Sequence, residues 1–154
     1  MSKRTEAVVA SAILVLVLHT LTLSVLASNS GKERGIEWNG QGKGTTKAIG
    51  VGIYQDNKCT DPLVSIDWGV LESGSSKNGT HYIRNEGKKA LTLSLYTSNW
   101  NPSDSSDYIT LSWNYDGQPI DPNKVVQFML TLSTSAGVEG ITSFSFDFTI
   151  AGSR

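Results

Sequence analysis

SFSFDFTI, residues 143–150, is the clearest structural signal in this 154-residue chain. Three phenylalanines and one isoleucine occupy every second position of the stretch, and polar residues fill the positions between them. Strict alternation over this length predicts a β-strand that buries one face in an apolar core and exposes the other to water.

The same alternation recurs upstream, between turn signals such as Asn85-Glu86-Gly87 and Asp116-Gly117. No window after Ala27 has a helical period, so strands follow one another directly. We therefore expect an all-β domain, an Ig-like antiparallel β-sandwich of about seven strands. The expected strands cover residues 49–53, 63–68, 80–84, 91–96, 109–113, 126–132 and 144–150.

The first expected strand follows a glycine-rich stretch, residues 28–46, which we interpret as a linker. Ile49, Val51 and Ile53 would share one face of this strand. Two hypotheses remain open: the strand pairs within its own domain, or it swings out on the linker and completes the sheet of a neighbouring copy. The three side chains would fill the acceptor groove in the second case.

The run Ala7 to Ala27 contains 21 residues and no charge. As a helix it would span about 32 Å, close to the thickness of a bilayer core. Lys3 and Arg4 precede it, which predicts a cytoplasmic N-terminus and a C-terminal domain outside the cell or the membrane. It is either a cleaved signal peptide or a retained transmembrane anchor. The expected parts are residues 1–27, the 28–46 linker and a 47–154 sandwich.

Composition excludes several functions. The formal net charge is −1, so the chain lacks the basic footprint of a nucleic-acid-binding protein. Cys59 is the only cysteine, which rules out an intramolecular disulfide. Beyond the apolar run the only histidine is His81, inside an expected strand. A lone histidine without a nucleophile beside it does not make a catalytic site, so we predict no enzyme activity and no cofactor.

Three features remain as candidate sites. Asn78-Gly79-Thr80 is an acceptor motif for N-glycosylation on an expected loop. Trp100 lies beside a polar loop and is a candidate surface aromatic for sugar binding. Oxygen ligands for calcium occur in two loops, but neither has EF-hand spacing, and no metal site is predicted from them; they are Asp56, Asn57 and Asp61, and Asp104 and Asp107.

Three short segments resemble the Ig-like modules of secreted archaeal cell-surface proteins, which are similar to subunits of extracellular archaeal filaments. They are Ser65–Gly69 (SIDWG), Ile83–Gly87 (IRNEG) and Ser98–Pro102 (SNWNP). Lys3–Val9 (KRTEAVV) also resembles the start of an archaeal type IV pilin, although the usual small residue at the cleavage point is missing. The resemblance implies a fold and an extracellular or membrane location.

Together these observations favour an extracellular structural protein, a subunit of a cell-surface filament or surface layer, whose partners are copies of itself. The alternative is a membrane-anchored adhesion or carbohydrate-binding module without catalytic activity. Membrane contact would run through residues 7–27 if they are not cleaved.

Overall fold

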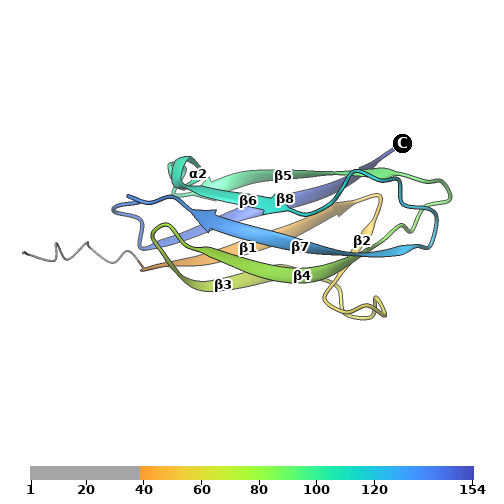
Figure 1. The fold of residues 1–154 in the computed structure, drawn as a ribbon, viewed down its shortest axis with the longest axis horizontal. Coiled ribbons are helices and arrows are strands. Elements are labelled where there is room, and N and C mark those ends of the chain that lie inside the picture. The colour runs from red at the N-terminus through yellow and green to blue at the C-terminus, as the bar shows by residue number, and fades with distance from the viewer. Residues whose placement is uncertain (1–38) are drawn as a thin grey trace, which may run out of the picture. The chain divides into compact units, whose positions relative to one another are not determined.

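The computed structural model describes residues 39–154, which form two four-stranded β-sheets (Figure 1). The first sheet has the order β3-β1-β8-β5 and the second the order β2-β4-β7-β6. The strands of the first sheet are β3 (Ser65–Glu72), β1 (Asn39–Ile49), β8 (Ser143–Ser153) and β5 (Thr92–Asn101). Those of the second are β2 (Gly52–Tyr54), β4 (Ser76–Arg84), β7 (Val125–Thr134) and β6 (Ile109–Trp113).

The core lies between the two sheets and consists of the apolar faces that the sequence predicted. Phe144, Phe146, Phe148 and Ile150 of β8 are all buried, as are Phe128, Leu130 and Leu132 of β7. Alternation therefore identified β7 and β8 correctly, because each has one face on the core and one toward solvent. The prediction of an all-β, two-sheet domain is confirmed for the described residues.

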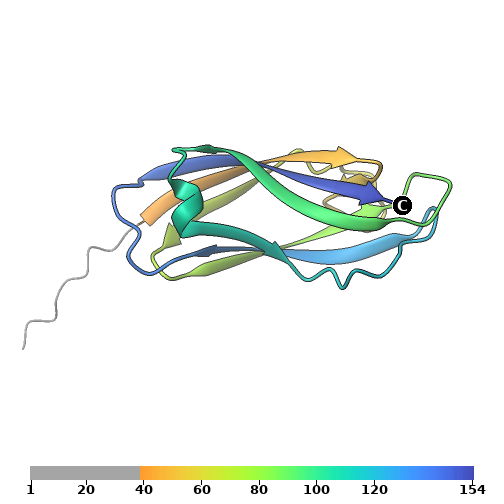
Figure 2. The same ribbon diagram turned by 90° about the horizontal axis from the view of Figure 1, so that it is seen from above.

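Strand β1 lies in the middle of its sheet, and this departs from the prediction of a wholly antiparallel sandwich. It pairs antiparallel with β3 and parallel with β8, from Gln41–Ser143 to Ile49–Ala151. Figure 2 shows β1 running beside β8 in the same direction. Parallel neighbours need a long connection, and here almost the whole domain forms it, because β1 is the first of the described strands and β8 the last.

The start of the domain was predicted too late. β1 begins at Asn39, whereas the sequence placed residues up to 46 in a glycine-rich linker. Glycine disfavours strands on its own, but here the glycines alternate with polar residues and lie against bulky neighbours, so tertiary packing overrides the local preference. The remaining linker residues, 28–38, lie outside the described part of the chain.

The first expected strand, residues 49–53, is also wrong as a single element. The chain leaves the first sheet after Ile49, turns at Gly50 (φ +76°) and enters the second sheet at Gly52. Ile49, Val51 and Ile53 therefore do not share a strand face. This corner raises the strand number of the described residues to eight, one more than predicted.

Helix is confined to one short element in the described residues, α2 (Ser105–Tyr108), which lies in the polar loop before β6. Between residues 39 and 154 no helix has the length and apolar character needed to cross a membrane. The predicted hydrophobic helix over residues 7–27 lies outside the described part of the chain.

Candidate assembly site around strand β1

Main-chain hydrogen bonds hold β1 on both sides. Its neighbours are β3 from Glu72 to Ser65 and β8 from Ser143 to Ala151. Thr46 N also donates to Val64 O (2.9 Å), just before β3 begins. β1 thus fills a groove between two strands that belong to later parts of the chain, and filling it completes the sheet.

At every second position from 42 to 48, β1 carries a small residue beside a large one of β8, and the first two of these small residues are buried. In the parallel register, Gly42 lies beside Phe144, Gly44 beside Phe146, Thr46 beside Phe148 and Ala48 beside Ile150. The Phe144 ring covers Gly42 so closely that even a methyl group there would clash with it. A Cβ at Gly44 would lie 3.3 Å from both Phe146 Cζ and Trp68 Nε1. The rings of β8 and β3 therefore occupy the space that side chains of β1 would otherwise take.

The outward face of β1 carries one ionic contact. Lys47 Nζ lies 2.8 Å from Asp147 Oδ2 on β8, and Asn99 Nδ2 on β5 donates to the same oxygen (2.8 Å). The Lys47 ammonium and the Asn99 amide hold the pKa of Asp147 below its ordinary value. This exposed cluster links three strands of one sheet.

The corner after β1 separates the two sheets. Ile49 is 58% exposed at the end of β1, whereas Val51 and Ile53 are buried in the core. The three predicted assembly residues are thus dispersed: one on the surface, one in the turn and one in β2. The residues that face the groove from β1 are the small ones described above, which sequence reasoning missed.

The strand after the corner is held firmly in its own sheet. Tyr54 OH donates to Glu86 Oε1, and Arg84 Nη2 donates to Tyr54 OH (2.9 Å) and to Glu86 Oε1 (2.7 Å). The Arg84 guanidinium also lies over the Tyr54 ring, 5.1 Å from its centroid. The hydrogen bond from Tyr54 and the one from Arg84 lower the pKa of Glu86. β2 is therefore fixed to β4 independently of β1.

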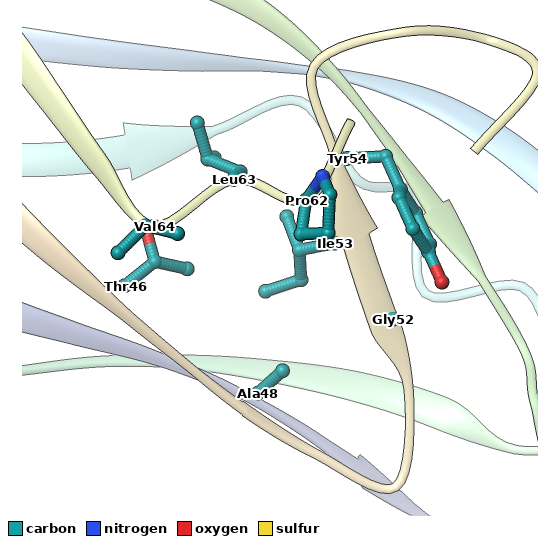
Figure 3. Close-up of a pocket in the computed structure, with 8 residues that line it drawn as sticks. All are labelled: Thr46, Ala48, Gly52, Ile53, Tyr54, Pro62, Leu63 and Val64. Carbon is teal, nitrogen blue, oxygen red and sulfur yellow. The ribbon is translucent and has the colours of Figure 1, made fainter. Parts of the chain in front are cut away.

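A pocket of about 270 Å³ opens beside the corner (Figure 3). Ala48, Gly52, Ile53, Leu63 and Val64 are among its lining residues, and no charged side chain lines it. Thr46 and Tyr54 also line the pocket, and their hydroxyls are its polar side-chain groups. The pocket leaves free space next to the point where β1 and β2 diverge.

Side chains occupy backbone groups of the two edge strands of this sheet. In β3, Asp67 Oδ1 accepts from Gly69 N (2.8 Å) and Lys77 Nζ donates to Trp68 O (2.8 Å). In β5, Leu93 N donates to Tyr115 OH (3.3 Å). β3 also bulges at Trp68, where its register with β1 shifts. Occupied and bulged edges resist the addition of a further strand.

The other candidate sites lie apart from β1. Asn78 is exposed in the middle of β4, opposite Thr131, rather than on a loop. Trp100 is partly buried and stacks on Phe146 (centroids 4.3 Å apart), so one face of its ring packs against the core. Cys59 is a buried free thiol.

His81 and the acidic loops show no arrangement for catalysis or metal binding. Burial lowers the pKa of His81, and neither ring nitrogen has a hydrogen-bond partner in the described structure. Asp56 accepts from the backbone N–H groups of Lys58, Thr60 and Asp61, so its carboxylate stabilises its own loop. Desolvation opposes ionisation of Asp56, but these hydrogen bonds outweigh it and lower its pKa. Within residues 39–154 no cluster of His, Cys, Asp or Glu could hold a metal ion.

No protein-family model matches the chain, and comparison with curated proteins finds no significant match.

Proposed function

We propose that the protein is an extracellular structural subunit with an Ig-like β-sandwich, and that copies assemble into a cell-surface filament or surface layer by exchanging strand β1. One observation carries the proposal: β1, the first described strand, fills an internal groove while contributing no large side chain to it. The same groove in another copy offers the same hydrogen bonds and the same rings.

Three features of the chain favour exchange. The first is energetic: the main-chain bonds of β1 to β3 and β8 re-form in full when β1 inserts into another copy, so exchange changes few contacts. The second is positional: β1 lies toward the chain start, so it can leave without unthreading other strands. The third is mechanical: β2 keeps its own anchors at Tyr54 and Arg84 when β1 departs.

Exchange is also favoured over edge-to-edge addition to the sheet that contains β1. The backbone groups of β3 and β5 that Lys77, Asp67 and Tyr115 engage are not free to bind another strand. An internal strand that leaves its groove opens two hydrogen-bonding edges at once, and a neighbour's β1 closes both. When the copy that receives a subunit's β1 differs from the copy that supplies β1 to that subunit, the contact is heterologous and continues into a chain.

The test uses one cysteine in each of two populations, both with Cys59→Ser. Thr45 and Ser65 are exposed register partners on β1 and β3. Donors carry Thr45→Cys and acceptors Ser65→Cys, so neither can form a disulfide within one chain. Antiparallel partners are close enough for a disulfide, and we expect a donor–acceptor product after the populations are mixed under mild oxidation.

The matched control is an acceptor with cysteine at exposed Ser106, which is not opposite β1. It should give no product with the Thr45→Cys donor above the level of either population alone. Polymers that form without a 45–65 product would overturn strand exchange. A chain that stays monomeric at every concentration would overturn the filament.

The location is tested by the intact mass of the protein from the cell envelope and from the medium. A mass that starts near Ser28 in the medium would support a released, self-assembling subunit. A full-length chain found only in the membrane fraction would favour the monomeric adhesion module instead.

A further inference from the structure

The groove that holds β1 has a size requirement at its floor. Phe144 lies over Gly42, and Phe146, Phe148 and Trp68 surround Gly44 at contact distance. These rings are held from the other side as well: Trp100 of β5 stacks on Phe146 at an interplanar angle of 14°. Phe146 and Phe148 are 2% and 0% exposed, so other parts of the domain enclose both rings.

Other strands of this chain do not meet that requirement. β7 presents Phe128, Leu130 and Leu132 on its inward face, and β8 presents its phenylalanines. Either strand would drive large side chains into the rings of the groove. A one-residue slip of β1 itself would turn Gln41 and Lys43 inward, with the same result.

From this geometry we infer that the groove selects its incoming strand by the small size of the side chains that face it. It accepts a strand parallel to β8 only when glycines face Phe144 and Phe146. Gly42 and Gly44 are then specificity determinants of assembly. Phe144 is the acceptor residue whose ring lies against Gly42 and excludes a larger side chain at that position. The partner is β1 of a second copy. This inference rests on the proposed strand exchange and adds the rule by which the strand is recognised.

The selection works mainly by exclusion. Most strands that could invade an open groove are apolar, and such strands are the usual agents of misassembly. A groove already filled by its own rings rejects them sterically, whereas a glycine-alternating strand still forms every main-chain bond. The glycines of β1 offer little apolar area to bury against another sheet, but they fit beside the rings of this one.

The experiment is a size exchange between donor and acceptor, built on the Thr45→Cys and Ser65→Cys populations. A Gly42→Leu donor should give at least about tenfold less product with the parent acceptor, because its side chain meets the Phe144 ring. A Phe144→Ala acceptor removes that ring and should recover product with the Gly42→Leu donor. A Lys43→Leu donor, changed on the exposed side of the same strand, should react like the parent.

The outcomes separate the two proposals. If the parent pair reacts and the Gly42→Leu donor reacts equally well with the parent acceptor, the size rule is overturned while strand exchange stands. If the parent pair gives no product, strand exchange fails. The size rule is then tested by the stability of the monomer, in which β1 lies in its own groove. There Gly42→Leu should lower the melting temperature and added Phe144→Ala should raise it again; no loss with Gly42→Leu would overturn the rule. Circular dichroism verifies that each variant is folded.

Discussion

Strands β1 and β8 are neighbours in one sheet and run in the same direction, yet they contribute opposite things to the core. β8 places Phe144, Phe146 and Phe148 between the sheets, whereas β1 places two glycines and Thr46 alongside them. β8 stabilises the domain by burying apolar area. β1 stabilises it chiefly through main-chain hydrogen bonds on both sides.

The difference shows that two strands can both be central in a sheet and yet bury very different amounts of apolar side-chain area. A strand that buries large side chains leaves a large cavity when it departs, while one that buries glycines leaves mainly unpaired backbone. Unpaired backbone can be satisfied by any identical strand, including one from another copy. This inequality makes β1 the strand suited to exchange.

The largest effect should come from truncating the β8 side of the pair. Phe148→Ala removes a fully buried ring, and we expect a loss of about 3–5 kcal/mol in the free energy of unfolding. Thr149→Ala, on the opposite face of the same strand, should cost much less. Urea denaturation of both variants measures the contrast, and similar losses would contradict the role assigned to the β8 rings.

A change at the corner should affect β1 alone. Gly50 has φ +76°, and Gly50→Val should cost the closed monomer about 1–2 kcal/mol because an L-residue disfavours that backbone conformation. Space is not the obstacle, since the nearest atom to a Cβ there is Gly152 O at 3.7 Å. An exchanged subunit can extend this corner, so the variant should assemble more readily while its monomer is less stable.

Gly137→Val is the matched control for the corner. Gly137 also has positive φ (94°) and open space around a Cβ, but it lies far from β1 in sequence, in the loop before β8. It should lose similar stability without a gain in assembly, as measured by light scattering against concentration. An equal gain in both variants would mean that general destabilisation, not the corner, drives association.

A smaller effect is expected at Thr46, beside Phe148. Its Oγ1 is buried and has no hydrogen-bond partner in the described structure. Thr46→Val replaces this hydroxyl with a methyl group of similar size and should raise the free energy of unfolding by up to about 1 kcal/mol. Thr45→Val, on the exposed face, is the control, and a loss at position 46 would show that the hydroxyl is satisfied by water.

The smallest effect concerns the ionic contact between Lys47 and Asp147. The pKa of Asp147 is lower in the folded state than in the unfolded chain, so the contact stabilises the domain above the unfolded pKa, near 3.8. That contribution disappears as the pH falls through the lower, folded value. Lys47→Gln should therefore be slightly less stable than the parent at neutral pH and equal to it in strong acid. A difference that persists in acid would contradict this assignment.

Much of the fold could be predicted because hydrophobic alternation reports burial directly. β6, β7 and β8 each bury every second residue, and the sequence placed all three. Trp68, at the end of the expected strand 63–68, is 4% exposed. Trp100 was expected on the surface because its neighbours are polar, but the stacking partner that buries it, Phe146, lies 46 residues away.

β1 could not be recognised by the same signal, because it has no large apolar side chains on its core face. Rings from the neighbouring strands fill the core volume beside it. Glycines at positions 40, 42 and 44 alternate with Gln41, Lys43 and Thr45. Side-chain size therefore alternates with a period of two, whereas hydrophobicity does not. That period was visible in the sequence, but the rings that give it meaning come from β8 about 100 residues later. The candidate site was missed for the same reason.

The pairing of the first described strand with the last also sets an order in time. Residue 45 meets residue 147 only after the whole intervening domain has been made, and contacts so distant in sequence form slowly. Until then a newly made β1 has no groove of its own, while β3 is already available as one edge. A chain that emerges near finished copies therefore passes through an interval in which β1 has no complete set of partner strands. If copies exchange β1 as proposed, the length of that interval, rather than the final stability, would govern how often they do so.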